Sequence, residues 1–226
     1  MDTTWLDLGG VLVANPMNAA TNVFLAAQCA IYALILRRHQ ESGADEWATF
    51  LSLLSLATGA GAVKHGFGYA LDAATYEVVL AVTNVAGGLS TYFAQLATLR
   101  RRPYAQRPLL RTVAYVQVCV FFVANLVVGP ELLLLIANTV VGLVPVIVIE
   151  GRAAPGLRSG SAMIALGLLV ATLAGLVYLV DVSLGPWFNH IDLAHAVMAV
   201  SFHAIAWGAG PGAPSGSVPA CESWTS

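Results

Sequence analysis

The sequence has unusually few charged residues for its length. Only 10% of the 226 residues are charged, whereas 58% are hydrophobic. A soluble domain carries roughly 25% charged residues. So few charges cannot cover a folded chain of this size with a solvated surface. This shortage excludes an ordinary soluble domain and predicts a protein surrounded by lipid, in agreement with the positive mean hydropathy.

Cysteine is also scarce, with three residues that show no paired spacing. Cys29 and Cys119 fall within apolar runs, and Cys221 lies near the C-terminus. This pattern excludes a disulfide framework and a cysteine-rich metal site, so we expect three free thiols.

Long apolar runs make up most of the sequence. A transmembrane helix needs roughly 20 mostly apolar residues. Runs of about this length occupy residues 20–36, 47–63, 73–99, 110–128, 132–149, 161–184 and 192–208. Pro and Gly follow several of these runs, as expected where helices end, and Pro145 should kink the fifth helix. We therefore predict an all-α polytopic membrane protein with seven transmembrane helices.

The predicted chain has three parts: an outer N-terminal segment (1–19), a seven-helix transmembrane domain (20–209) and a disordered cytoplasmic tail (210–226). The apolar stretch from Trp5 to Val13 is too short to span a membrane and lacks the basic start of a signal peptide. We expect it to lie on the surface or to form a lid. The tail is rich in Pro, Gly and Ser, which disfavours a packed structure.

The basic residues predict the orientation. Nine of the ten fall in the loops after the first, third and fifth helices, and Lys64 is the exception: Arg37, Arg38, Arg100, Arg101, Arg102, Arg107, Arg111, Arg152 and Arg158. By the positive-inside rule these loops are cytoplasmic, so the N-terminus is outside and the C-terminus is in the cytoplasm. We interpret the arginines as a topology anchor and not as a nucleic-acid patch, and we expect a bacterial inner (plasma) membrane.

Histidines and acids collect at the predicted outer ends of the helices. The group consists of His65, Asp72, Glu77, Asp181, His190, Asp192 and His195, and His203 lies about 12 Å deeper than His195. An ionisable side chain within a membrane costs roughly 2.5–3.5 kcal/mol on insertion scales. Such residues are retained where they pair, bind an ion or line a wet cavity.

Neutral imidazoles beside carboxylates suit a zinc ion, with water in the fourth position. We predict His65, His190 and His195 as zinc ligands. His190 and His195 are about 140° apart around an ideal helix, so both reach one ion only if His190 precedes the first turn.

The acids at the same level have two interpretations. As catalytic residues, Asp72, Glu77 or Asp192 would take a proton from the metal-bound water or orient a ligand. As structural residues, Asp72 and Asp192 would stabilise helix N-termini, and Asn189 would form a capping pair with Asp192.

The segments Lys64-His65-Gly66-Phe67-Gly68 and Asn189-His190-Ile191-Asp192-Leu193-Ala194-His195, within seven helices, resemble the superfamily of alkaline ceramidases and adiponectin receptors. The resemblance implies a zinc-dependent hydrolase that cleaves an amide or ester in a lipid-like substrate at the outer leaflet. Three features depart from the family pattern. Gly61 replaces a serine, four residues separate His190 from His195 where the family has three, and neither acid of the third helix is in the family's register.

Two alternatives come from other classes. Histidines on different helices, His65 with His195 or His203, would ligate a haem in an electron carrier. A transporter or receptor would instead use buried amides as a polar path, although such residues also hold helices together. These amides are Asn22, Gln28, Asn84, Gln117, Asn125 and Asn138.

Overall fold

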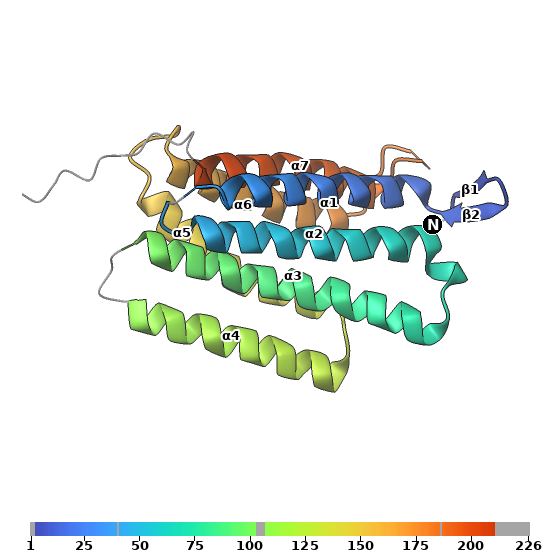
Figure 1. Cartoon of the computed structure of the whole chain (residues 1–226), viewed down its shortest axis with the longest axis horizontal. Helices are drawn as coiled ribbons and strands as arrows, with labels where there is room; N and C mark the ends of the chain where they lie inside the picture. Colours follow the sequence, from blue (N-terminus) through green and yellow to red (C-terminus); the bar gives the residue numbers. More distant parts are fainter. Residues whose placement is uncertain (1–2, 40, 103–106, 186, 211–226) are drawn as a thin grey trace, which may run out of the picture.

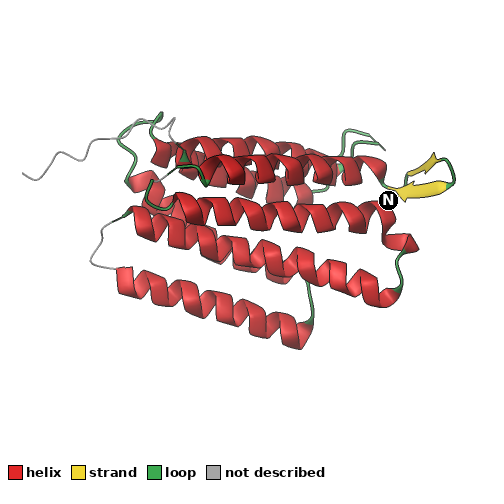
Figure 2. Cartoon of the chain, viewed as in Figure 1, coloured by secondary structure: helices red, strands yellow, loops and turns green. Residues whose placement is uncertain are grey.

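The computed structural model describes residues 3–39, 41–102, 107–185 and 187–210. Over these residues the chain forms a bundle of seven long helices, with a two-stranded hairpin beyond one end (Figure 1). Figure 2 shows that loops join the helices at the two ends of the bundle. The helices are α1 (Pro16–Leu36), α2 (Ala44–Phe67), α3 (Ala73–Arg101), α4 (Arg107–Val128), α5 (Leu132–Arg152), α6 (Gly160–Leu179) and α7 (His190–Ala209).

Five of the described helices, α1, α4, α5, α6 and α7, are long and apolar enough to cross a membrane. The all-α class and several membrane-crossing helices are therefore as predicted for a multi-pass membrane protein. The helix α3 packs against α2, α4 and α5 and buries polar side chains, including Asn84, Ser90 and Gln95. An interior helix of this kind gains hydrogen-bond partners from its neighbours and needs fewer apolar residues than a helix that faces lipid.

Side-chain caps fix the starts of three helices. Asp72 caps α3, Ser159 caps α6 and Asn189 caps α7. The predicted capping pair is confirmed, since Asn189 accepts from the backbone of α7 while Asp192 accepts from the Asn189 backbone. The sixth helix was predicted to reach residue 184, but α6 ends at Leu179. Two residues later Asp181 has a φ of 56°, in the left-handed region that ends a helix.

The N-terminal segment forms an antiparallel hairpin of β1 (Trp5–Leu8) and β2 (Val11–Ala14). The turn at Gly9 and Gly10 uses φ values of 67° and 92°, which glycine adopts without a steric penalty. The hairpin contacts the link between α2 and α3, the short helix η1 (Gly68–Ala70), through the rings of Trp5 and Tyr69. The predicted tail (210–226) lies outside the described residues, except for Gly210.

Sequential helices pack side by side, and contacts between α1 and α7 join the first helix to the last. The pair α6 and α7 approaches closely because of glycine. A Cβ on Gly167 would lie 2.7 Å from Ile205 Cγ1 and 2.9 Å from the Ser201 carbonyl oxygen. Residues of α1, α2, α3, α5, α6 and α7, among them Leu25 and Trp47, form the central apolar core.

The three arginines that follow one another at the end of α3 bind three different parts of the bundle. Arg100 Nε lies 2.7 Å from Glu46 Oε1 on α2. Arg101 donates to the Gly208 carbonyl on α7 at 3.3 Å. Arg102 contacts α5 and α6 through acidic and hydroxyl side chains. The end of α3 therefore holds the ends of α2, α5, α6 and α7 together.

Candidate functional site at the seam of α1 and α7

The hydroxyl of Thr21 on α1 lies between two ionisable side chains of α7. Its Oγ1 is 2.8 Å from His195 Nδ1 and 3.2 Å from Asp192 Oδ1. Asp192 and His195 are three residues apart, so they project from the same face of α7. The last helix thus presents an acid and an imidazole to a single hydroxyl of the first helix.

Asp192 is fully buried, yet its carboxylate is well supplied with donors. The Asn189 backbone N–H donates to Oδ2 at 3.0 Å. In the amide orientation that satisfies its surroundings, Asn18 Nδ2 lies 2.7 Å from Oδ1 and 2.9 Å from Oδ2. Such donors replace part of the hydration that a carboxylate loses on burial. Asn18 and Thr21 of α1 therefore complete a polar site that α7 begins.

These contacts define how His195 carries its proton. A carboxylate is a stronger acceptor than a neutral imidazole, so the Thr21 hydroxyl donates to Asp192. The same hydroxyl oxygen then accepts from Nδ1–H of His195, which leaves the lone pair of the ring on Nε2. A histidine held in this way through one nitrogen presents the other as a base or as a metal ligand.

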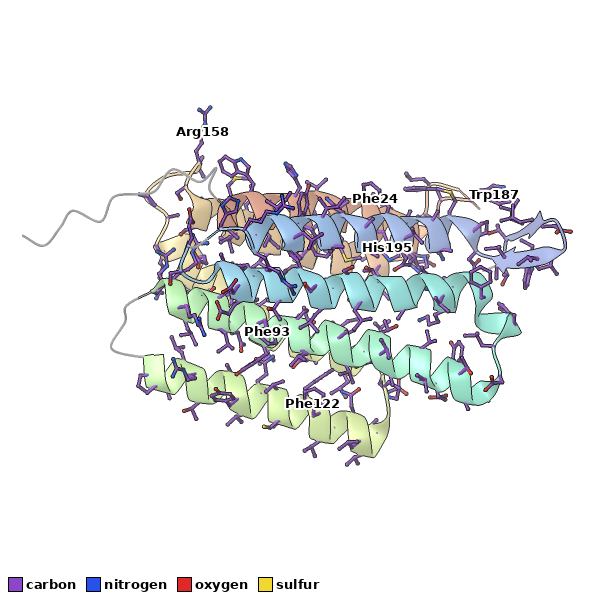
Figure 3. The ribbon with its side chains drawn as sticks, in the orientation of Figure 1. Phe24, Phe93, Phe122, Arg158, Trp187 and His195 are labelled. Carbon is purple, nitrogen blue, oxygen red and sulfur yellow. The ribbon has the colours of Figure 1, made fainter. Side chains whose placement is uncertain are left out.

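His195 borders a groove of about 370 Å³ between α1 and α7. Apart from Thr21 and His195, its lining is apolar: Ala20, Phe24, Ala196 and Ala199. Figure 3 places Phe24 and His195 at the same level of the bundle, and Phe24 is 60% exposed on its outer surface. A hydrocarbon chain can therefore occupy the groove from the side of the bundle with its polar end beside His195.

The other two predicted zinc ligands lie differently with respect to His195. His65 is half-buried near the end of α2, the helix next to α1. His190 turns toward the loop after α6, where its Nδ1 lies 2.6 Å from Asp181 Oδ1, out of line for a hydrogen bond. Its ring also packs on Tyr178, with centroids 5.3 Å apart.

The predicted metal set is therefore not drawn together. Within residues 3–39, 41–102, 107–185 and 187–210, no three His, Cys, Asp or Glu side chains are placed to hold one ion. The reason is local, because His190 is the first residue of α7 and not part of the preceding loop. Its side chain keeps the wide helical separation from His195 that the spacing implies. Zinc binding stays a prediction.

Two predicted catalytic acids are placed on α3, away from the seam. The Asp72 carboxylate accepts from the Thr75 backbone N–H at 2.9 Å and from its hydroxyl at 2.7 Å. These hydrogen bonds lower the pKa of Asp72, as expected for a capping carboxylate. Glu77 is exposed near the start of the same helix. Of the three predicted acids, Asp192 is the one that joins a histidine.

The amides proposed as a polar path mostly bind neighbouring backbone or one another. Gln117 of α4 donates to Asn138 Oδ1 of α5 at 2.9 Å, and Asn138 donates to the Gly88 carbonyl of α3 at 3.2 Å. Gln95 of α3 also donates to Gln117. These bonds hold α3, α4 and α5 together, which is the packing role that such residues often have in membranes.

Sequence reasoning missed Asn18 and Thr21. The predicted first helix began at residue 20, which left Asn18 in the N-terminal segment. The available signal was their spacing of three residues, which places both polar side chains on one face once the helix is extended to Pro16.

The fold and the seam together define a helical, multi-pass membrane protein with a buried acid and imidazole near one end of its bundle. The chain belongs to the family of unknown function DUF6962, whose model matches residues 17–213. No curated protein and no solved structure matches the chain.

Proposed function

We propose that the chain is a membrane hydrolase that cleaves an amide or ester bond in a lipid-like substrate. The observation that carries this proposal is the position of His195. Its Nδ1 is held by Thr21 and Asp192, and its ring borders an apolar groove at the side of the bundle. A general base needs both a fixed ring and access to substrate, and this residue has both.

In the proposed reaction, Nε2 of His195 takes a proton from water while the water oxygen attacks the carbonyl carbon. Asp192 stabilises the imidazolium through the Thr21 hydroxyl. The imidazolium then returns the proton to the leaving nitrogen or oxygen, which completes hydrolysis. The acyl chain of the substrate lies between α1 and α7, along Phe24 and Ala199. The bilayer thus supplies the substrate directly from the side.

Zinc binding is a separate prediction that is compatible with the proposed reaction. A zinc ion held by His65 and His195 would activate water and polarise the carbonyl. A third protein ligand is not in position among the described residues. No step of the proposed reaction therefore depends on the metal.

We also propose that all seven helices span a bacterial inner membrane, with the N-terminus outside and the seam site in the outer leaflet. The arginine contacts favour this topology. Arg100 binds the start of α2, and Arg101 binds the end of α7. The basic loop after α3 therefore lies at the same end of the bundle as the basic loop that precedes α2, as the positive-inside rule requires. Thr21 is near the start of α1, and Asp192 and His195 are near the start of α7, so the seam site is at the end of the bundle opposite to these arginines.

The test is hydrolysis by the purified full-length chain in nanodiscs that contain ceramide-like amides or ester lipids, with products measured by mass spectrometry. We expect His195→Gln to lower the rate by about a hundredfold or more, the usual contribution of a general base. Asp192→Asn should also lower it. His39→Gln is the control, because it removes a histidine that lines neither groove of the seam. Hydrolysis that survives His195→Gln, or no hydrolysis of either lipid class, would refute the proposal.

A further inference from the structure

A second groove lies on the same seam, toward the opposite end of α7. It has a volume of about 240 Å³, and its walls include Tyr32, Ile35 and Leu36 of α1 with His203 and Trp207 of α7. His203 follows His195 by about two helical turns, so both histidines lie on the side of α7 that faces α1. Neither the catalytic proposal nor the zinc prediction uses this second groove.

His203 is held in the same manner as His195, by a hydroxyl of α1. Its Nδ1 lies 2.7 Å from the hydroxyl of Tyr32. Tyrosine has one hydroxyl proton, and when it donates to Nδ1 the imidazole carries its own proton on Nε2. His203 is exposed on the groove side, so Nε2–H is available to an acceptor oxygen. A ligand of this groove therefore needs both an acceptor and an apolar part.

Two exposed arginines, Arg38 and Arg158, lie at the end of the bundle that holds this groove. Arg38 is exposed immediately beyond the end of α1, close in sequence to Ile35 and Leu36. Arg158 is also exposed, just before the start of α6, and Figure 3 shows it projecting from this end of the bundle. The start of α6 lies against the end of α7, since a Cβ on Gly208 would be 2.5 Å from the Gly160 carbonyl oxygen. The groove and the two exposed arginines thus belong to the same end of the bundle.

We propose that this groove binds one anionic phospholipid. The phosphate lies between Arg38 and Arg158, as in basic lipid sites between transmembrane helices. A glycerol ester carbonyl accepts from Nε2–H of His203, which lies about 9 Å from the end of α7 and so below the level of the phosphate. One acyl chain follows Ile35 and Leu36, and Trp207 takes the interfacial position that its ring favours.

The test uses Trp207 as the reporter. The full-length chain is reconstituted in phosphatidylcholine vesicles that contain a brominated lipid, either phosphatidylglycerol or phosphatidylcholine. Bromine quenches a tryptophan that it contacts, and the difference between the native chain and Trp207→Phe isolates the signal of this residue. We expect brominated phosphatidylglycerol to quench Trp207 at a lower mole fraction than brominated phosphatidylcholine.

The variants separate a site from general attraction to an anionic membrane. One arginine strengthens binding to anionic lipid by about fivefold. Arg38→Gln should therefore lower the preference of this site for phosphatidylglycerol by about that factor. Arg111→Gln is the matched control, because this exposed arginine is on α4, across the bundle from the seam (Figure 1). Equal quenching by the two lipids, or an equal loss in both variants, would overturn the proposal. The test measures lipid binding alone, so the lipid-site proposal holds or fails independently of the proposed hydrolysis.

Discussion

Arg102 and Glu150 form an ion pair inside one end of the bundle, with Arg102 Nη2 at 2.7 Å from Glu150 Oε2. The Glu150 side chain is fully buried, and that of Arg102 is 19% exposed. Arg102 also contacts the Ser161 hydroxyl, so one guanidinium joins α3 to both α5 and α6. The arginines that indicate topology in the sequence therefore also connect helices.

Glu150→Gln should destabilise the protein strongly. The change leaves the Arg102 charge without its buried carboxylate, a loss of about 3 kcal/mol in comparable pairs. Thermal unfolding in detergent measures this loss of stability. Glu46→Gln is the matched control, since its partner Arg100 is 65% exposed and water replaces the lost contact. Equal losses in stability for the two variants would contradict the assignment of Arg102 and Glu150 as the structural pair.

Thr21 should act as a positioning residue for His195. Thr21→Ser keeps the hydroxyl and should preserve lipid hydrolysis within a few-fold. Thr21→Ala removes the link to Asp192, and we expect a loss of about tenfold or more, as for other groups that orient a functional histidine. The pH dependence of kcat should also change in Thr21→Ala, because the carboxylate no longer stabilises the imidazolium through the hydroxyl. Identical pH profiles for the alanine and serine variants would exclude the relay.

We predict one zinc ion per chain, bound by His65, His190 and His195. Binding requires His190 to turn away from Asp181 and toward the other two rings. Elemental analysis of the purified protein measures the metal, and His65→Ala combined with His195→Ala should remove it. His39→Ala combined with His203→Ala is the control pair. A sub-stoichiometric metal content that the first pair does not change would end the zinc hypothesis.

The orientation predicts which surfaces a membrane-impermeant thiol reagent reaches. In a cysteine-free background, a single cysteine at exposed Arg158 should be labelled from the cytoplasmic side. One at Trp187, which is 54% exposed in the loop before α7, should be labelled from outside. The reversed pattern would place the seam site of Thr21 and His195 in the cytoplasmic leaflet.

Gly167 and Gly175 on α6 provide a matched pair for helix packing. An alanine at Gly167 meets Ile205 and the Ser201 carbonyl on α7 and should destabilise the protein by about 1–3 kcal/mol. Nothing lies within 4 Å of a Cβ at Gly175, so alanine there should be neutral or slightly stabilising. Thermal unfolding compares the two. A harmless Gly167→Ala would mean that α6 and α7 pack less closely than described.

The sequence predicted the helices well because lipid requires long apolar runs, and these are visible without an alignment. The strand pairing of Trp5–Leu8 with Val11–Ala14 was not predicted, since two short apolar segments carry little signal. The shared depth of His65 and His195 was predicted from their places at helix ends. The direction of His190 was not predicted, because it depends on Asp181, whose left-handed backbone begins the loop after α6 in a way that helix periodicity does not encode.

The seam joins α1 and α7, which are far apart in the sequence. Neighbours in sequence, such as α1 with α2 and α6 with α7, can associate as hairpins while the chain is still being made, because short loops close early. Thr21 meets Asp192 and His195 only after α7 has entered the membrane. A chain that lacks α7 can therefore bury much of its apolar surface without forming the polar cluster, so the cluster forms only once α7 has docked on α1.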